Sequence, residues 1–243
     1  MSELIGVAMR LHGPMQAWGG PVVGDDRPTL SFPTKSGVLG IVACAMGILR
    51  SEVARLIALA DGTRVHIRVD APGTPFVDDQ TIQDNPNASE TRQTIQSKRT
   101  YLADASFVAV VVPGQNTSIE AIGDALAEPV FAPYLGRRTC VPSTPILLAR
   151  KVSATDPVDL FATLARGPEE LFQQTSVRED GGVDYYLDAD DHPRRLRRLP
   201  LRDLLAGPLP RQFRERFVVH VRERANRAHL DAAIDPWATQ NLT

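Results

Sequence analysis

The chain has 243 residues, 43% apolar and 23% charged, a balance typical of a soluble globular protein that buries a sizeable core. No apolar run approaches the ~20 residues of a membrane-spanning helix, and the first ten residues do not resemble a signal peptide, so we expect a cytoplasmic protein without a membrane contact. Cys44 and Cys140 stand far apart without histidines at ligand spacing, so we expect no disulfide framework, metal or other cofactor.

Charge is distributed unevenly along the chain. The formal net charge is −2, yet residues 194–227 hold eleven arginines and three acids. Such asymmetry indicates a basic face on an acidic body, which suits a polyphosphate partner. The alternative is a solvated surface whose arginines form salt bridges with acids elsewhere in the chain.

The first quarter of the chain predicts one strand and two helices. Alternating apolar residues indicate a strand over residues 5–11, which a loop rich in Gly and Pro follows. Thr34 is expected to cap a helix over residues 35–49, and Ser51 to cap a short helix over residues 52–59.

The next segment predicts strands around a polar insertion. A strand is expected over residues 65–69, and residues 71–96 are too polar and too rich in proline to bury much, so they should project as a loop or hairpin. A strand over residues 106–112, a helix over 118–127 and a final strand over 130–135 follow. The order approximates an α+β, ferredoxin-like βαββαβ fold.

The second half predicts a smaller, β-rich part. The expected elements are strands over residues 146–152, 183–187 and 217–221, and a helix that begins at Asp156-Pro157 and ends at Leu164. We therefore divide the chain into a ferredoxin-like domain over residues 1–140, a β-rich C-terminal subdomain over 141–224 and a flexible tail over 225–243.

Four short segments carry candidate binding residues. The loop after the first strand should expose Gln16 and Trp18, which could read a base edge and stack on a base. The alternative is that Trp18 packs into the core. Arg27, together with Lys35 and Ser36 at a helix N-terminus with free amide donors, suits phosphate, although the spacing of a nucleotide-binding P-loop is absent.

The other two segments are basic. Arg92, Lys98 and Arg99, close to Tyr101, could form the base of a basic finger after the projecting insertion. Gly136 would let the backbone approach a ligand, while Arg137 and Arg138 could form forked bonds with phosphate. The alternative for Arg137 and Arg138 is a loop with solvated arginines. The alternative for Lys35 is a capped helix with a surface lysine.

An enzymatic reading also exists. His12, Lys35 and Tyr101 could together act as the general acid and base of a metal-independent ribonuclease. Pairs of adjacent carboxylates, such as Asp25-Asp26, are more typical of solvated loops than of a metal site. We rank a binding module above this enzyme.

A series of motifs resembles the CasD family, the type I-E member of the fifth group of CRISPR-associated proteins, in register from residue 4 to about residue 222. In order, they are Leu11-x-Gly13-Pro14-Met15-Gln16-Ala17-Trp18-Gly19, Arg27-Pro28-Thr29, Phe32-Pro33-Thr34-Lys35-Ser36-Gly37-Val38-Leu39-Gly40, Tyr101-Leu102-x-Asp104-Ala105-Ser106-Phe107, Pro133-Tyr134-Leu135-Gly136-Arg137-Arg138-x-Cys140 and Leu209-Pro210-Arg211-Gln212-Phe213, where x is a position that does not carry the resemblance.

The resemblance implies a modified ferredoxin-like domain of the repeat-associated RNA-binding superfamily. It places a hairpin thumb at about residues 71–100. Type I-C relatives cut precursor RNA, whereas type I-E members resemble them in fold and leave cutting to a separate subunit. The insertion over residues 71–96 matches the family least.

The resemblance further implies a subunit of the Cascade complex in antiviral defence. Such a subunit holds the 5′ handle of the crRNA and caps the backbone filament. Its partners would be the backbone subunit, the large PAM-reading subunit and, as a further contact, target DNA near the PAM. The residues expected to bind RNA are Gln16, Trp18, Arg27, Lys35, Ser36, Arg92, Lys98, Arg99, Tyr101, Gly136, Arg137, Arg138 and Arg211.

Two further hypotheses stay open. One is the endoribonuclease described above, acting on CRISPR precursor RNA. The other is a structural cap whose Arg-rich C-terminal part binds protein carboxylates.

Overall fold

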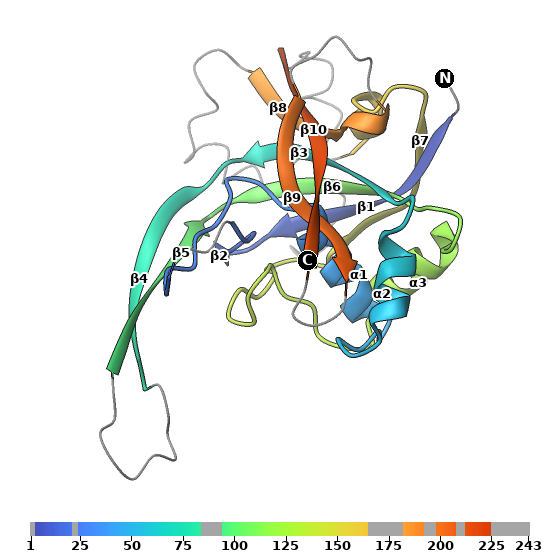
Figure 1. Ribbon diagram of the computed structural model, residues 1–243. Coiled ribbons are helices and arrows are strands. Elements are labelled where there is room, and N and C mark those ends of the chain that lie inside the picture. Colours follow the sequence, from blue (N-terminus) through green and yellow to red (C-terminus); the bar gives the residue numbers. More distant parts are fainter. Residues whose placement is uncertain are drawn as a thin grey trace, which may run out of the picture.

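The computed structural model describes residues 3–20, 24–83, 94–164, 182–191, 198–207 and 212–224. This part of the chain has an α+β architecture of mostly antiparallel strands, as the sequence predicts (Figure 1). Its α-helices are α1 (Lys35–Ala45), α2 (Val53–Ala60) and α3 (Ile119–Ala127).

The described strands form two sheets. The larger sheet contains β1 (Leu4–His12), β3 (Arg64–Ala71), β6 (Ser106–Val112), β7 (Leu147–Ala154), β8 (Gly182–Asp188), β9 (Arg198–Gly207) and β10 (Gln212–Arg224), in the order β7-β1-β6-β3-β8-β10-β9. The smaller sheet contains β2 (Met15–Gln16), β4 (Thr74–Gln83) and β5 (Thr94–Ala103), in the order β2-β5-β4.

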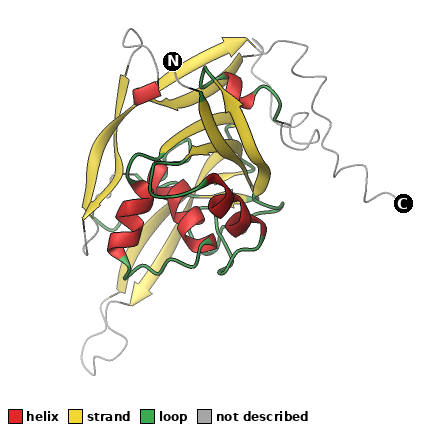
Figure 2. Ribbon diagram, turned by 90° about the vertical axis from the view of Figure 1, so that its right-hand side faces the viewer, coloured by secondary structure: helices red, strands yellow, loops and turns green. Residues whose placement is uncertain are grey.

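Strand β6 lies between two apolar cores. Every one of its residues is buried, and successive side chains point to opposite faces of the sheet. Phe107 and Val111 pack with the residues of the three helices, which gather on one side of the large sheet (Figure 2), while Val108 and Val110 pack on the other side. Because β6 is buried on both faces, its sequence is an almost continuous run of apolar residues rich in Val.

The sequence predicts the residues that cap α1 and α2, and the structure agrees for α1 only. The Oγ1 atom of Thr34 accepts a hydrogen bond from the amide of Gly37 at 3.2 Å, which confirms the predicted cap of α1. The cap predicted for α2 is wrong: Glu52, not Ser51, occupies the capping position. The carboxylate of Glu52 accepts from the amide of Leu49 at 2.7 Å and holds the turn between the two helices.

The polar insertion forms a long hairpin that extends away from the body (Figure 1). Strands β4 and β5 pair in unbroken antiparallel register from Thr74↔Ala103 to Gln83↔Thr94. We call the β4–β5 hairpin the thumb, and the end that joins the body its root. Residues 84–93, between the two strands, lie outside the described part.

Two predicted elements are wrong. Residues 130–135 form bends and irregular chain instead of a strand, because the amide of Val130 donates to Ala45 near the end of α1 and the edge of β1 pairs with β7. The helix predicted up to Leu164 is reduced to a 3-10 turn over Asp159–Phe161. Arg68 Nη1 donates to the carbonyls of Phe161 and Leu164, so these oxygens accept from a side chain.

Strands from both halves of the chain share the large sheet. Strand β3 pairs with β8, and β1 pairs with β7. Strand β9 was missed by the sequence analysis. The division at residue 140 stays a prediction, and the tail over residues 225–243 lies outside the described residues.

Candidate nucleic-acid interface

A loop and a thumb strand join at Arg27. The amide of Arg27 donates to the carbonyl of Lys98 at 2.8 Å, and the amide of Thr100 donates to the carbonyl of Arg27 at 3.0 Å. The loop segment thereby adds to the free edge of β5 beyond the short strand β2. Arg27 and Lys98, two residues predicted from separate motifs, lie side by side at the thumb root.

Arg137 fastens this joint. Its guanidinium carbon lies 4.5 Å from the centre of the Tyr101 ring. Its Nη1 donates to the carbonyl of Thr100 at 3.1 Å, and its Nη2 donates to the carbonyl of Arg27 at 2.6 Å. Tyr101 stacks in turn on Phe76 of the opposite thumb strand, with ring centres 5.4 Å apart. Two donors that the sequence suggested for phosphate therefore hold backbone carbonyls.

Gly136 brings the turn before Arg137 against the loop after β1. Its φ of +92° is strained for other residues, and an added Cβ would lie 1.6 Å from the carbonyl oxygen of Ala17. The amide of Ala17 donates to the carbonyl of Leu135 at 3.1 Å. Close backbone approach was predicted for Gly136, but its partner within the chain is Ala17.

The expectation that Gln16 and Trp18 are exposed is wrong. Both are buried, and the indole Nε1 of Trp18 donates to Oε1 of Gln16 at 3.0 Å. Gln16 Nε2 donates to the carbonyls of Leu11 and Ala105. The alternative reading, in which Trp18 packs into the core, is the correct one, because the pair satisfies its own polar atoms inside the protein.

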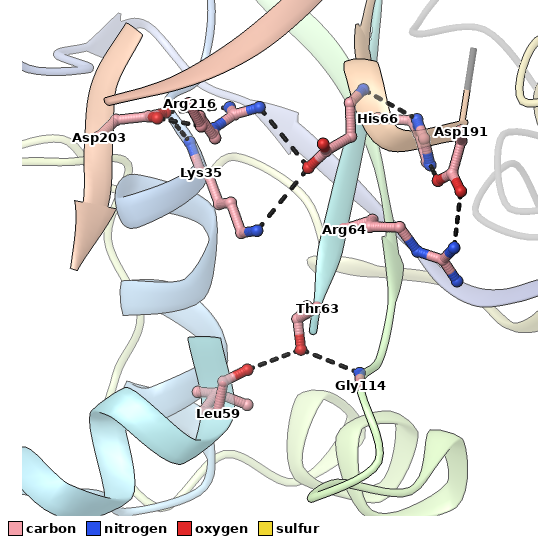
Figure 3. A network of polar contacts seen from close by, with 10 residues as sticks. Lys35, Leu59, Thr63, Arg64, His66, Gly114, Asp191, Asp203 and Arg216 are labelled. Atoms are coloured by element: carbon pink, nitrogen blue, oxygen red, sulfur yellow. Dashed lines mark hydrogen bonds and ion pairs between the residues drawn. The ribbon is translucent and has the colours of Figure 1, made fainter. Parts of the chain in front are cut away.

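Lys35 is buried as well, in a cluster of charges below β8, β9 and β10. The carboxylate of Asp203 accepts from the Lys35 amide at 2.7 Å and from two nitrogens of Arg216 at 2.6 and 3.0 Å. Asp188 lies 3.7 Å from both the Lys35 ammonium and Arg216. We call these four residues the buried charge cluster. Figure 3 labels its members Lys35, Asp203 and Arg216, with His66 beside them. The Nδ1 atom of His66 accepts a hydrogen bond from the Asp188 amide at 3.3 Å.

The buried charge cluster changes the interpretation of the α1 N-terminus. The sequence suggested free amides and an accessible cation for phosphate, and this is wrong at Lys35, because Asp203 accepts the bond from its amide. Burial lowers the pKa of the Lys35 ammonium, and the charge of Asp188 opposes that change. Ser36 is half-buried, with its Oγ 3.4 Å from the Oγ1 of Thr34.

Exposed cations remain around the joint. Arg27, Lys98 and Arg138 are exposed, and Arg99 is half-buried. The side chain of Arg27 folds back to donate to the carbonyls of Gly24 and Asp26. Arg92 and Arg211, also predicted to bind RNA, lie outside the described residues.

The residues of the enzymatic reading have different surroundings. His12 is half-buried with Nδ1 3.3 Å from the carbonyl of Ala105, and burial lowers the pKa of its imidazole. Tyr101 is buried below Arg137, and Lys35 belongs to the buried charge cluster. Two of the three candidate groups are therefore inaccessible to a substrate in this conformation.

Some residues of the site escaped sequence reasoning. Asp188, Asp203 and Arg216, which surround Lys35, follow it by more than 150 residues, and no local pattern connects them with it. Phe76, which supports Tyr101, sits in the polar insertion, where a lone aromatic residue in a β-hairpin pattern is the only signal.

Across the described residues, no group of three or more His, Cys, Asp or Glu side chains is placed to hold a metal ion. The helices in the same part of the chain are all too short or too polar to cross a membrane.

Comparisons with known proteins converge on CRISPR-associated proteins. A family model described as "CRISPR-associated protein (Cas_Cas5)" matches residues 6–224. CRISPR system Cascade subunit CasD of Escherichia coli (strain K12) is 32% identical over 182 residues, which cover 70% of this chain and 81% of that protein.

Two solved structures resemble this chain in both sequence and fold. A chain of a "CRISPR RNA-guided surveillance complex" is 32% identical with a TM-score of 0.66, and the match covers 89% of each chain. A "Crystal structure of Cas protein" is 30% identical with a TM-score of 0.57, and covers 89% of this chain and 94% of that one.

Proposed function

This chain belongs to the CRISPR-associated Cas5 family, and from that premise we propose that it is a non-catalytic RNA-binding subunit of a Cascade-type CRISPR interference complex. In this complex it holds the 5′ handle of the crRNA and caps the backbone filament in antiviral defence. The likeness to Cascade subunit CasD supports the assembly.

The observation that carries RNA binding is the joint at the thumb root. Arg137 fastens the loop at Arg27 to β5, and exposed Arg27, Lys98 and Arg138 surround this fixed point. Cations on a rigid support can contact successive phosphates of a single strand without losing much conformational entropy on binding. Half-buried Arg99 follows Lys98 on β5, and Gly136 sets the position of Arg138. Ser36, at the start of α1, stays a candidate contact.

In this proposal the buried candidate residues hold neighbouring segments in position and do not contact RNA themselves. Gln16 and Trp18 hold the loop after β1, Tyr101 supports Arg137, and Lys35 belongs to the buried charge cluster below β10. Their substitution should disturb the surface that carries the exposed cations, without removing a direct contact with RNA. Arg92 and Arg211 stay candidate contacts.

The strand order supports a modified ferredoxin-like domain. The succession β7-β1-β6-β3, with α1 and α3 packed in one core, corresponds to a βαββαβ arrangement. In this assignment β7 supplies the fourth strand, which the sequence analysis placed at residues 130–135. Strands β8, β9 and β10 would form the β-rich C-terminal part.

The proposal includes protein partners and a passive role in RNA processing. The partners are the backbone subunit and the large PAM-reading subunit, with target DNA near the PAM as a further contact. The burial of Lys35 and Tyr101 supports the absence of ribonuclease activity. Incubating the full chain with repeat RNA in EDTA checks this point: the RNA should stay intact, and specific cleavage lost on His12→Ala would contradict the proposal.

Salt dependence of RNA binding tests the main claim. The variant Arg27→Ala/Lys98→Ala/Arg138→Ala should bind single-stranded repeat RNA more weakly. Its plot of log affinity against log salt should also be less steep, with the magnitude of the slope reduced by about 2, because each lost phosphate contact on a single strand removes about 0.7. Arg150→Ala, an exposed arginine paired with Asp124 on α3, is the control. A triple variant with the slope of the wild type would refute this surface.

A further inference from the structure

Three aromatic rings form a stack on the large sheet, outside the thumb root. Phe32 lies parallel to Tyr186, with ring centres 3.7 Å apart and an angle of 9° between the planes. Tyr186 stacks on His220, with ring centres 4.9 Å apart and an angle of 18°. Three nearly parallel planes from a loop, β8 and β10 therefore form one column.

The register of the sheet explains the position of the column. Tyr186 and His220 are direct partners across β8 and β10, so their side chains rise from the same face. That face also carries Asp188 of the buried charge cluster, two residues along β8 from Tyr186. Phe32 belongs to the loop before α1 and is buried in the main core.

The column is closed at one end and accessible at the other. Phe32 is 7% exposed, whereas the His220 side chain keeps 40% of its surface. The Nε2 atom of His220 lies 2.9 Å from Oδ1 of Asp184, and this contact fixes the orientation of the imidazole. A solvent-exposed ring on a strand gains little stability from such orientation, but a ring used for stacking benefits from it.

The charge beside His220 indicates what kind of group fits. Asp184 repels a phosphate, whereas a base offers an uncharged aromatic face. Stacking of an unpaired base on an aromatic side chain contributes about 1–3 kcal/mol to single-strand binding. A partly exposed ring that extends two parallel rings is a platform of this kind.

The column is also within reach of the thumb root. Five residue steps separate Arg27, which joins the thumb, from Phe32, and an extended chain of that length spans at most about 18 Å. A short stretch of single-stranded RNA that contacts Arg27 could therefore extend to His220.

We propose that His220, supported by Tyr186 and Phe32 and oriented by Asp184, stacks on one unpaired base of the bound RNA. The site rests on the proposed function, since it uses RNA held at the thumb root. It adds a base contact at a position that the RNA-binding motifs of the sequence do not include.

Fluorescent RNA tests the proposal. Single-stranded repeat RNAs with 2-aminopurine at successive handle positions are titrated with the full chain. One position should be quenched by the wild type through stacking, His220→Ala should lose that quenching and bind about five- to tenfold more weakly, and His220→Phe should keep both properties. Phe217→Ala is the matched control, because Phe217 is an exposed aromatic residue on the opposite face of β10.

Each other outcome overturns the site. Unchanged affinity and quenching in His220→Ala would show that no base stacks there, and equal losses in His220→Phe would show that stacking is not the interaction. Normal RNA binding by His220→Ala with impaired assembly into the complex would assign His220 to a protein partner. A wild type that ignores RNA would refute the proposed function itself, and this site with it.

Discussion

Lys98 and Asp79 lie directly opposite each other across the thumb, and both side chains are exposed. Arg99 lies opposite Asp78 in the same way, one position along and on the other face of the hairpin. Each of these thumb cations therefore has a carboxylate as its cross-strand neighbour. The thumb root is less positive than its Lys and Arg alone would suggest.

Removing one of these acids should strengthen RNA binding. In Asp79→Asn, Lys98 no longer faces a competing anion, so affinity for single-stranded repeat RNA should rise about two- to fivefold at low salt. The gain should shrink as salt is added. Fluorescence anisotropy over a salt series measures both effects. Asp124→Asn, which removes an exposed acid of α3 that pairs with Arg150 of β7, should have no effect on affinity. Equal gains in both variants would show that only net charge matters.

Arg137 should act as a clamp that lysine cannot replace. Arg137→Lys keeps the charge but loses the planar stacking on Tyr101 and the two-pronged donation to the carbonyls of Thr100 and Arg27. We expect the local opening free energy to fall by about 1–2 kcal/mol. Hydrogen exchange of the Thr100 amide, which donates to Arg27, reports it directly. Arg138→Lys is the control, and equal protection in both variants would contradict the clamp.

Gly136 should tolerate no side chain. In Gly136→Ala the new Cβ would overlap the carbonyl of Ala17 at a φ of +92°, so the free energy of unfolding should fall by about 2 kcal/mol or more. Gly40→Ala, on an open surface of α1, should instead raise it by about 0.5–1 kcal/mol. Urea unfolding compares the two. If Gly136→Ala left the free energy of unfolding unchanged, the turn would have to move freely away from the loop after β1.

Lys35 should make stability depend on pH in the alkaline range. Burial lowers the pKa of its ammonium below the ordinary 10.5. Between the folded pKa and 10.5 the unfolded chain still holds the proton that the folded chain has lost, so the Lys35 contribution to the unfolding free energy rises with pH there. The stability of the wild type relative to Lys35→Met should therefore increase towards pH 10.5. A flat or falling difference between the wild type and Lys35→Met over this pH range would refute the shift.

Signals that act over a few residues were readable from the sequence. Thr34 caps α1 because a hydroxyl three residues before an amide is a local arrangement. The alternation of Val65 and Ile67 correctly indicated β3. Strand β9 was missed because its mixed pattern, with Pro200, alternates poorly and is defined by pairing with β10 across register shifts.

Signals between distant segments were not readable. The motif around Lys35 predicts an accessible cation equally well whether or not Asp188 and Asp203 later cover it. Arg137 likewise shows two donors in the sequence, but the carbonyls that accept them come from β5 and from the loop at Arg27. The residue types of the site were therefore predictable, while the partners of each residue depend on tertiary packing.

The pairing of β3 with β8 has a consequence for shortened forms of the chain. Residues 67–69 of β3 pair with β8 along what would otherwise be an open border of the sheet. A fragment ending at Ala154 would leave those residues unpaired beside an apolar surface, the arrangement that invites edge-to-edge aggregation between copies. Late-sequence strands thus protect an early one, and truncation should cost solubility before it costs secondary structure.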